Sequence, residues 1–129
     1  MGQRAAKKGD RIEGKDLHLV KFPNGVVQLI PLDFKGTIDD TVSPNVNIMG
    51  AAAATVGSVG TNRPEHKLAL SPPQDFVVKP NNRGTIRNGS GTVSINGRAA
   101  ARDGDLVDTC HDVPGVPPKV VASGSVLIG

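Results

Sequence analysis

The sequence predicts an all-β protein of short strands and tight turns with pseudo-threefold symmetry. Three observations support this prediction. A six-residue pattern recurs three times, the apolar residues fall in short runs between turn-forming residues, and glycine and proline together account for 26 of the 129 residues. Because glycine and proline are poor helix formers, this composition excludes a helical bundle.

The repeated pattern consists of two small residues, two variable residues, a glycine, and then an aspartate or a serine. It occurs at residues 5–10, 53–58 and 100–105. Three such segments in consistent order indicate three similar structural units, because internal repeats usually reflect repeated supersecondary structure.

Two of the three copies follow a similar apolar lead-in, at residues 46–50 and 93–97. The chain closes with residues 126–129, which resemble this lead-in but have no repeat after them, whereas the first repeat has no lead-in before it. We therefore expect the C-terminal strand to pair beside the N-terminal segment and complete the third unit. This pairing would place the two termini next to each other.

The strand signals are short and are bounded by Gly, Pro, Asn or Asp, as expected for strands between turns. The stronger signals lie at residues 26–30, 46–49, 92–95 and 125–128, and the weaker ones at 76–78 and 119–121. Met49-Gly50 and Asn96-Gly97 are expected to end their strands in tight turns. The four alanines at 51–54 are too few to nucleate a helix.

The length predicts a single domain over residues 1–129, with a modest core. Since the chain has only three aromatic residues, this core must consist of Val, Ile, Leu and Ala. The Pro-rich segment at about 61–80 is expected to be an irregular insertion between units two and three.

Charge and apolar runs favour neither nucleic-acid binding nor a membrane segment. The net charge is +3, and the basic residues near the start are interpreted as a solvated terminus, because the stacking aromatic residues of single-strand binders are scarce. No run approaches the roughly 20 apolar residues of a membrane helix. The N-terminal segment lacks the apolar run of a signal peptide, so we expect synthesis and folding in a cytoplasm.

The histidines and the single cysteine occupy nearly equivalent positions in the three units. His18 and His66 each lie eight residues after the end of a repeat, and Cys110 and His111 lie five and six residues after the last one. Under threefold pseudo-symmetry, equivalent positions converge around the axis. Histidine and thiolate ligands that converge predict a structural, tetrahedral Zn²⁺ site, which would contribute to folding directly.

The same residues allow a plainer interpretation, in which three histidines lie on the surface and the thiol is buried. Within the metal hypothesis, Cys110 and His111 are difficult joint ligands, because adjacent side chains in an extended segment point apart. If one of them is not a ligand, we expect it to be His111, with water or another group completing the shell. The adjacent pair is also poor geometry for a Cys-His nucleophile.

The segment at residues 89–105, with the closing residues 124–129, resembles the PAAR-repeat family. Ala99 stands where the family's name-giving Pro-Ala-Ala-Arg motif has its proline, and the insertion at 61–80 resembles the PAAR-like subgroup. These proteins sharpen the spikes of contractile injection machines, which include type VI secretion systems and phage-tail-like extracellular injection systems.

The resemblance implies a small cone of short β-hairpins with a pointed vertex and a triangular base. The base would dock on the blunt end of a trimeric β-helical spike protein, VgrG-like or phage-spike-like, with one copy per trimer. It also implies a Zn²⁺ ion near the vertex, which maps onto His18, His66, Cys110 and, less surely, His111. Relatives tend to carry a histidine where this chain has Pro31-Leu32-Asp33-Phe34, so His111 is the candidate to compensate.

The function implied by the resemblance is mechanical, and no residue is expected to act as a catalyst. The tip would be assembled in a bacterial cytoplasm without a signal peptide, exported with the injection particle, and brought into transient contact with a target membrane. Any effector would be a separate chain. Two other hypotheses stay open, namely a stand-alone zinc-stabilised β binding module and a Cys-dependent hydrolase. A stable complex with a trimeric spike would distinguish the first of these, and loss of activity on blocking the thiol would identify the second.

Overall fold

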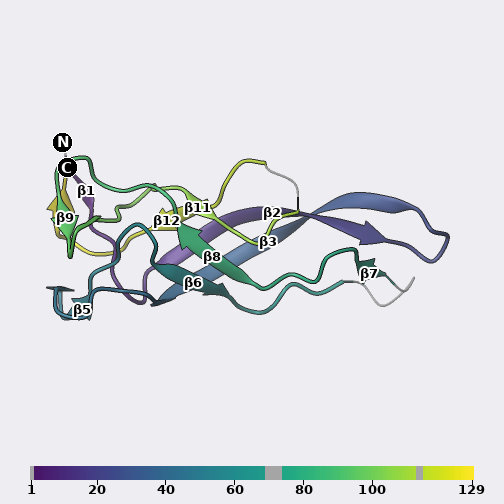
Figure 1. The fold of residues 1–129 in the computed structure, drawn as a ribbon, viewed down its shortest axis with the longest axis horizontal. Helices are drawn as coiled ribbons and strands as arrows, with labels where there is room; N and C mark the ends of the chain where they lie inside the picture. Colours follow the sequence, from purple (N-terminus) through teal and green to yellow (C-terminus); the bar gives the residue numbers. More distant parts are fainter. Residues whose placement is uncertain (1, 69–73, 113–114) are drawn as a thin grey trace.

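The computed structural model describes residues 2–68, 74–112 and 115–129, and every regular element within these ranges is a β-strand (Figure 1). This confirms the predicted all-β fold class. Within the same ranges, the chain forms no helix with the length and apolar character needed to cross a membrane.

The largest sheet has seven antiparallel strands. Its order is β11 (Val107–Asp108), β8 (Arg83–Ile86), β6 (Val59–Asn62), β3 (Val27–Asp40), β2 (Arg11–Lys21) and β12 (Lys119–Val121), and β7 (Asp75–Phe76) also pairs with β2. A bridge between Leu106 and Lys119 links the two ends of this order. The sheet therefore curls around on itself, which agrees with a small β cone.

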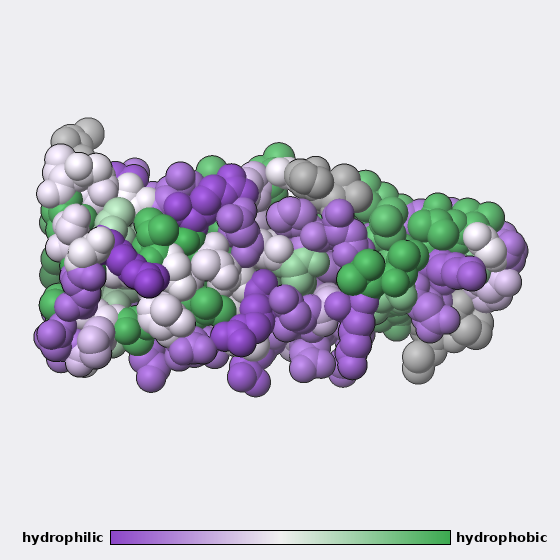
Figure 2. Space-filling view, in the orientation of Figure 1, coloured by the Kyte–Doolittle hydropathy of each residue, from purple (hydrophilic) through white to green (hydrophobic). Residues whose placement is uncertain are grey.

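Strands β2 and β3 form a long hairpin that carries one end of the molecule away from the termini (Figure 1). All eleven residues of β2 pair with β3, from Arg11 opposite Thr37 to Lys21 opposite Val27. The molecule is elongated and narrows toward this hairpin. Figure 2 shows apolar side chains gathering toward the hairpin end, where the exposed apolar residues include Val26, Val27, Leu29, Val77 and Val78.

Three small two-stranded sheets, two of them hairpins, lie at the opposite, broad end, which we call the base. They are β4 (Asn47–Ile48) with β5 (Ala51–Ala52), β9 (Ser94–Ile95) with β10 (Arg98–Ala99), and β13 (Leu127–Ile128) with β1 (Gln3–Arg4). The last pair confirms that the C-terminal strand lies beside the N-terminal segment. The first two hairpins turn through residue pairs with positive φ, Met49 and Gly50 at 52° and 83°, and Asn96 and Gly97 at 54° and 79°. These are the angles of the tight hairpin turns that the sequence predicted.

The three repeats meet in a cyclic set of backbone hydrogen bonds, which we call the alanine ring. The N–H of Ala6 donates to the carbonyl of Ala101 at 2.9 Å, that of Ala101 to Ala54 at 3.0 Å, and that of Ala54 to Ala6 at 3.0 Å. All three alanines are fully buried. Each repeat therefore bonds its two neighbours in the same way, and the predicted threefold relation is present in the backbone. Small side chains are needed here because the three strands approach closely around the axis.

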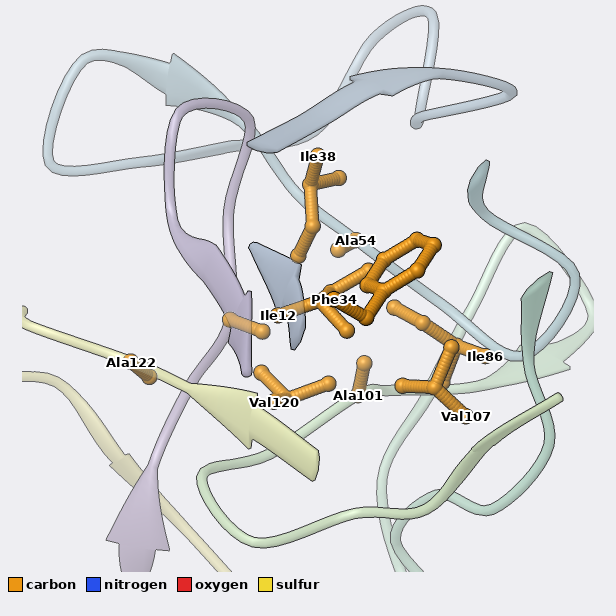
Figure 3. Packing of buried hydrophobic residues seen from close by; sticks show 10 residues of the cluster. Ile12, Phe34, Ile38, Ala54, Ile86, Ala101, Val107, Val120 and Ala122 are labelled. Carbon is orange, nitrogen blue, oxygen red and sulfur yellow. The ribbon is translucent and has the colours of Figure 1, made fainter. Parts of the chain in front are cut away.

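The apolar core fills the curled sheet next to the alanine ring. Phe34, Ile12, Ile38, Ile86, Val107 and Val120 point toward one another, with alanines filling the gaps between them (Figure 3). Cys110 packs against this cluster from its edge. Burial of these side chains supplies the main driving force for folding, at about 1.5 to 3 kcal/mol for each large aliphatic side chain. The core therefore fixes the strands that carry the polar residues beyond it.

The strands differ from the sequence predictions in several places. The strand predicted at 26–30 continues to Asp40 as β3. Strand β2 and six shorter strands were not predicted, namely β1, β5, β6, β8, β10 and β11. The segment at 61–80 is less irregular than expected, because it contains the end of β6 and all of β7, while its residues 69–73 lie outside the described residues. The strand predicted at 119–121 is confirmed as β12.

Candidate metal centre

Four side chains with metal-binding groups converge between the core and the long hairpin. They are Asp16, His18, His66 and Cys110, and one candidate ligand atom from each lies within 4.8 Å of the others. Asp16 and His18 come from β2, His66 from the segment after β6, and Cys110 from the segment after β11. Three of the four residues predicted as ligands therefore come together, and Asp16 joins them.

His111 lies outside this group of four. Its Nδ1 atom is 3.4 Å from the hydroxyl of Thr109, which in turn donates to Asp16. The divergence expected for adjacent residues accounts for its separation from Cys110. The fourth group of the cluster is thus a carboxylate that the sequence analysis did not consider.

The spacing of the four groups suits a tetrahedral metal ion. The Asp16 Oδ2 atom lies 3.0 Å from His66 Nε2, 3.3 Å from Cys110 Sγ and 3.8 Å from His18 Nε2, and the Cys110 Sγ and His18 Nε2 atoms are 3.9 Å apart. Tetrahedral zinc bonds imply ligand–ligand separations of roughly 3.4 to 3.6 Å. The observed distances bracket this value, so the donor set and its geometry fit a zinc ion.

The family model for the PAAR motif matches residues 78–129, and no curated protein matches the chain. The matched segment includes the third repeat, its hairpin and Cys110, and the structure relates this repeat to the two earlier ones through the alanine ring. Residues 78–129 are therefore a PAAR motif. The resemblance inferred from the sequence is thereby confirmed, and PAAR motifs are associated with structural spike-tip proteins of contractile injection systems.

Alternation along β2 places its acidic and imidazole groups on one face. Ile12, Asp16, His18 and Val20 are all buried, because residues two apart share a face of a strand. The ring of His18 packs edge-on against His66 and Phe76, with ring centroids 4.9 and 5.6 Å away. The aromatic contacts hold both imidazoles against the carboxylate.

Burial and neighbouring charges set the protonation states of the cluster. Burial alone would raise the pKa of Asp16, but hydrogen bonds from His66, Thr109 and Cys110 outweigh it and hold the pKa below its ordinary value. Burial, followed by repulsion from His66, lowers the pKa of His18. The Asp16 carboxylate is therefore charged at neutral pH and His18 is neutral, the states in which both groups can bind a metal.

The thiol of Cys110, within the PAAR motif, has the opposite character from a catalytic cysteine. Burial, together with the adjacent negative charge of Asp16, raises its pKa to about 12. A nucleophilic cysteine instead needs a depressed pKa and an exposed position. The environment of this thiol thus argues against the hydrolase hypothesis, whereas a bound cation would stabilise the thiolate.

Proposed function

We propose that this protein is the structural tip of a contractile injection spike. In this role it caps a trimeric β-helical spike protein, VgrG-like or phage-spike-like, and sharpens it for membrane piercing. The base would bind the end of the trimer, and the narrow hairpin end would face the target membrane. The PAAR motif at residues 78–129 supports this class of function.

The observation that carries the proposal is the alanine ring. Ala6, Ala54 and Ala101 give one chain three nearly equivalent sides, because each repeat makes the same hydrogen bond to the next. Three identical subunits around an axis present three equivalent surfaces. A single chain with this internal symmetry can therefore match all three subunits at once, at one copy per trimer.

A zinc ion in the cluster would serve the mechanical role by joining three separate segments at one point. Asp16 and His18 on β2, His66 after β6, and Cys110 after β11 would hold it. When bound, such an ion cross-links the segments and adds its binding energy to folding. Asp16 and His18 are 1% and 0% exposed and keep water from their side of the site, whereas His66 and Cys110 are partly exposed.

The remaining parts of the proposal concern assembly. We infer that the protein is assembled in a bacterial cytoplasm, leaves the cell with the injection particle, and can attach effector cargo. Contact with the target membrane would be transient, and nucleic acid is not a partner in this proposal.

Binding to a trimeric spike protein tests the proposal, with native mass spectrometry measuring the stoichiometry. We expect one chain per trimer. Leu127 in the base and Val78 near the hairpin end are similarly exposed, at 61% and 57%, and offer a matched pair of substitutions. Leu127→Asp should weaken the complex by at least about tenfold, equivalent to about 1.4 kcal/mol, whereas Val78→Asp should not change it.

The opposite pattern, or a folded, zinc-containing protein that does not bind the trimer, would reject the cap. The second of these results would favour the stand-alone zinc-stabilised module.

A further inference from the structure

We propose that His66 is the exchangeable member of the metal centre, and that the metal enters and leaves on the side of His66. Asp16, His18 and Cys110 would form a preorganised set of three ligands. His66 would bind the metal last and dissociate from it first. This inference rests on the zinc site of the proposed function. It follows from the polar groups behind the two imidazoles, the chain segments that carry these histidines, and a cavity beside His66.

The hydrogen bonds behind His66 fix which ring nitrogen carries its proton. The Lys35 N–H donates to Asn62 Oδ1 at 2.8 Å, and the His66 N–H donates to Asn82 Oδ1 at 2.8 Å. Since a backbone N–H can only donate, it assigns the oxygen of each amide. The nitrogen of Asn62 then donates to Asn82 at 3.0 Å and faces His66 Nδ1 at 3.3 Å.

The Nδ1 atom of His66 is consequently an acceptor, so a neutral His66 carries its proton on Nε2. That proton points to Asp16 Oδ2, 3.0 Å away. The Nε2 atom must give up this proton before it can bind a metal, and Nδ1 would then have to hold a proton against the Asn62 amide. The surroundings of His66 therefore oppose its metal-bound form.

The surroundings of His18 favour its metal-bound form. Its Nδ1 atom is buried, has no hydrogen-bond partner among the described residues, and lies 3.5 Å from the carboxylate of Asp112. The same carboxylate accepts the N–H of Leu19 at 2.9 Å, which fixes its position. A carboxylate behind a histidine holds the proton on the outer nitrogen and leaves the other free for the metal. His18 is thus already in the protonation form in which its Nε2 atom can bind a metal.

The backbone also separates the two histidines. Asp16 and His18 belong to the long hairpin, where β2 pairs with β3 along its whole length. His66 lies outside the strands, and its side chain is 2% exposed, whereas that of His18 is 0% exposed. A cavity of about 250 Å³ lies directly beside it, lined by residues that include Leu32, Lys35, Asn62, Arg63 and Lys67. This cavity gives solvent a route to the metal centre on the His66 side.

Transfer of zinc to a chromophoric chelator, followed by stopped-flow absorbance, tests the role of His66. His66→Ala should still bind one zinc per chain but release it about 10 to 100 times faster, the range typical of losing a supporting group. His18→Ala and Cys110→Ala should lose stoichiometric binding. His111→Ala, next to the site but outside the group of four, is the control and should behave as the wild type. Equal losses in the His18 and His66 variants would overturn the inference.

Substitutions at the cavity test the route. Leu32→Trp should slow loading and release by the same factor and leave the dissociation constant unchanged, whereas Leu32→Ala should accelerate both. Leu17→Trp, on the other face of the hairpin, is the matched control. Exchange rates that are unchanged in both Leu32 variants would refute the route.

The same proteins can be assayed for binding to the spike trimer, which separates the two proposals. A wild type without spike binding but with asymmetric zinc exchange would refute only the cap. A spike complex whose zinc exchange shows no dependence on His66 would refute only this inference.

Discussion

At the scale of single residues, Cys110 is the group whose chemistry changes most when a metal binds. Burial and Asp16 raise the pKa of its thiol to about 12, so the metal-free thiol is neutral at physiological pH. Zinc binds the thiolate, which means that loading must displace one proton from sulfur. The pKa values of Asp16 and His18 are lowered, so these two groups are already deprotonated and release none.

This difference predicts the pH dependence of zinc affinity. Below pH 12, each rise of one pH unit makes loss of the thiol proton tenfold easier, so the apparent affinity should rise about tenfold per unit between pH 7 and pH 9. Competition with a chelator of known affinity at each pH measures the slope. Cys110→Ala should abolish it, and a flat profile in the wild type would contradict thiolate ligation.

Among the site residues, His18, His66 and Cys110 could be predicted from the sequence because they are rare and occupy similar positions in their units. Asp16 could not, because it is one of twelve acidic residues. The signal that would have found it is Asp16-x-His18 on a strand, where residues two apart share a face. That strand was missed because its inward face is itself partly polar, so the usual alternation of apolar and polar residues is hidden.

At the scale of elements, β3 shows why strand lengths were underestimated. Pro31 and Gly36 suggest an interruption, but the strand continues through both. Lys35 accepts a hydrogen bond from Arg63 N on the side away from β2, so by alternation the nitrogen of Pro31 faces that same edge. A proline is tolerated there because its missing N–H would have no partner in the hairpin.

The turns of the three repeats give a prediction for stability. Gly9, Gly57 and Gly104 have φ values of 95°, 94° and 87°, which disfavour any residue with a side chain. A Cβ at Gly104 would meet nothing within 4 Å, so Gly104→Ala isolates the backbone effect. It should lower the free energy of unfolding by about 1 to 2 kcal/mol in denaturant titrations of the zinc-loaded protein.

Gly91 provides the control for this experiment, since it is equally open but lacks a positive φ. Gly91→Ala should change the free energy of unfolding by less than about 0.5 kcal/mol. Equal effects of the two substitutions would mean that the repeat turns do not require glycine.

At the scale of the whole molecule, two different kinds of interaction stabilise the base and the hairpin end. Backbone hydrogen bonds among Ala6, Ala54 and Ala101 hold the base, whereas the group of four can be joined by a metal nearer the hairpin. Removal of zinc should therefore expose the amides of Leu19 and Asp112 to hydrogen exchange while those of the alanine ring stay protected. Hydrogen exchange with mass spectrometry measures this, and a uniform loss of protection would contradict it.

The threefold base could be predicted from the sequence because three repeats in one order leave few other arrangements. The elongated shape could not be predicted in this way. It arises from the hairpin of β2 and β3, which belongs to the first unit alone and has no counterpart of similar length in the other two. A departure from a repeat carries no periodic signal, so only the structure reveals it.

The alanine ring also determines when the base can fold during synthesis of the protein. The N–H of Ala6 cannot donate its hydrogen bond until Ala101 has been synthesised. Similarly, Arg4 pairs with Leu127, which comes far later in the sequence. The N-terminal residues therefore leave the ribosome long before the partners that complete their unit exist. The base can close only after Leu127 has been synthesised, and until then the early strands remain open to chaperones or to unwanted partners.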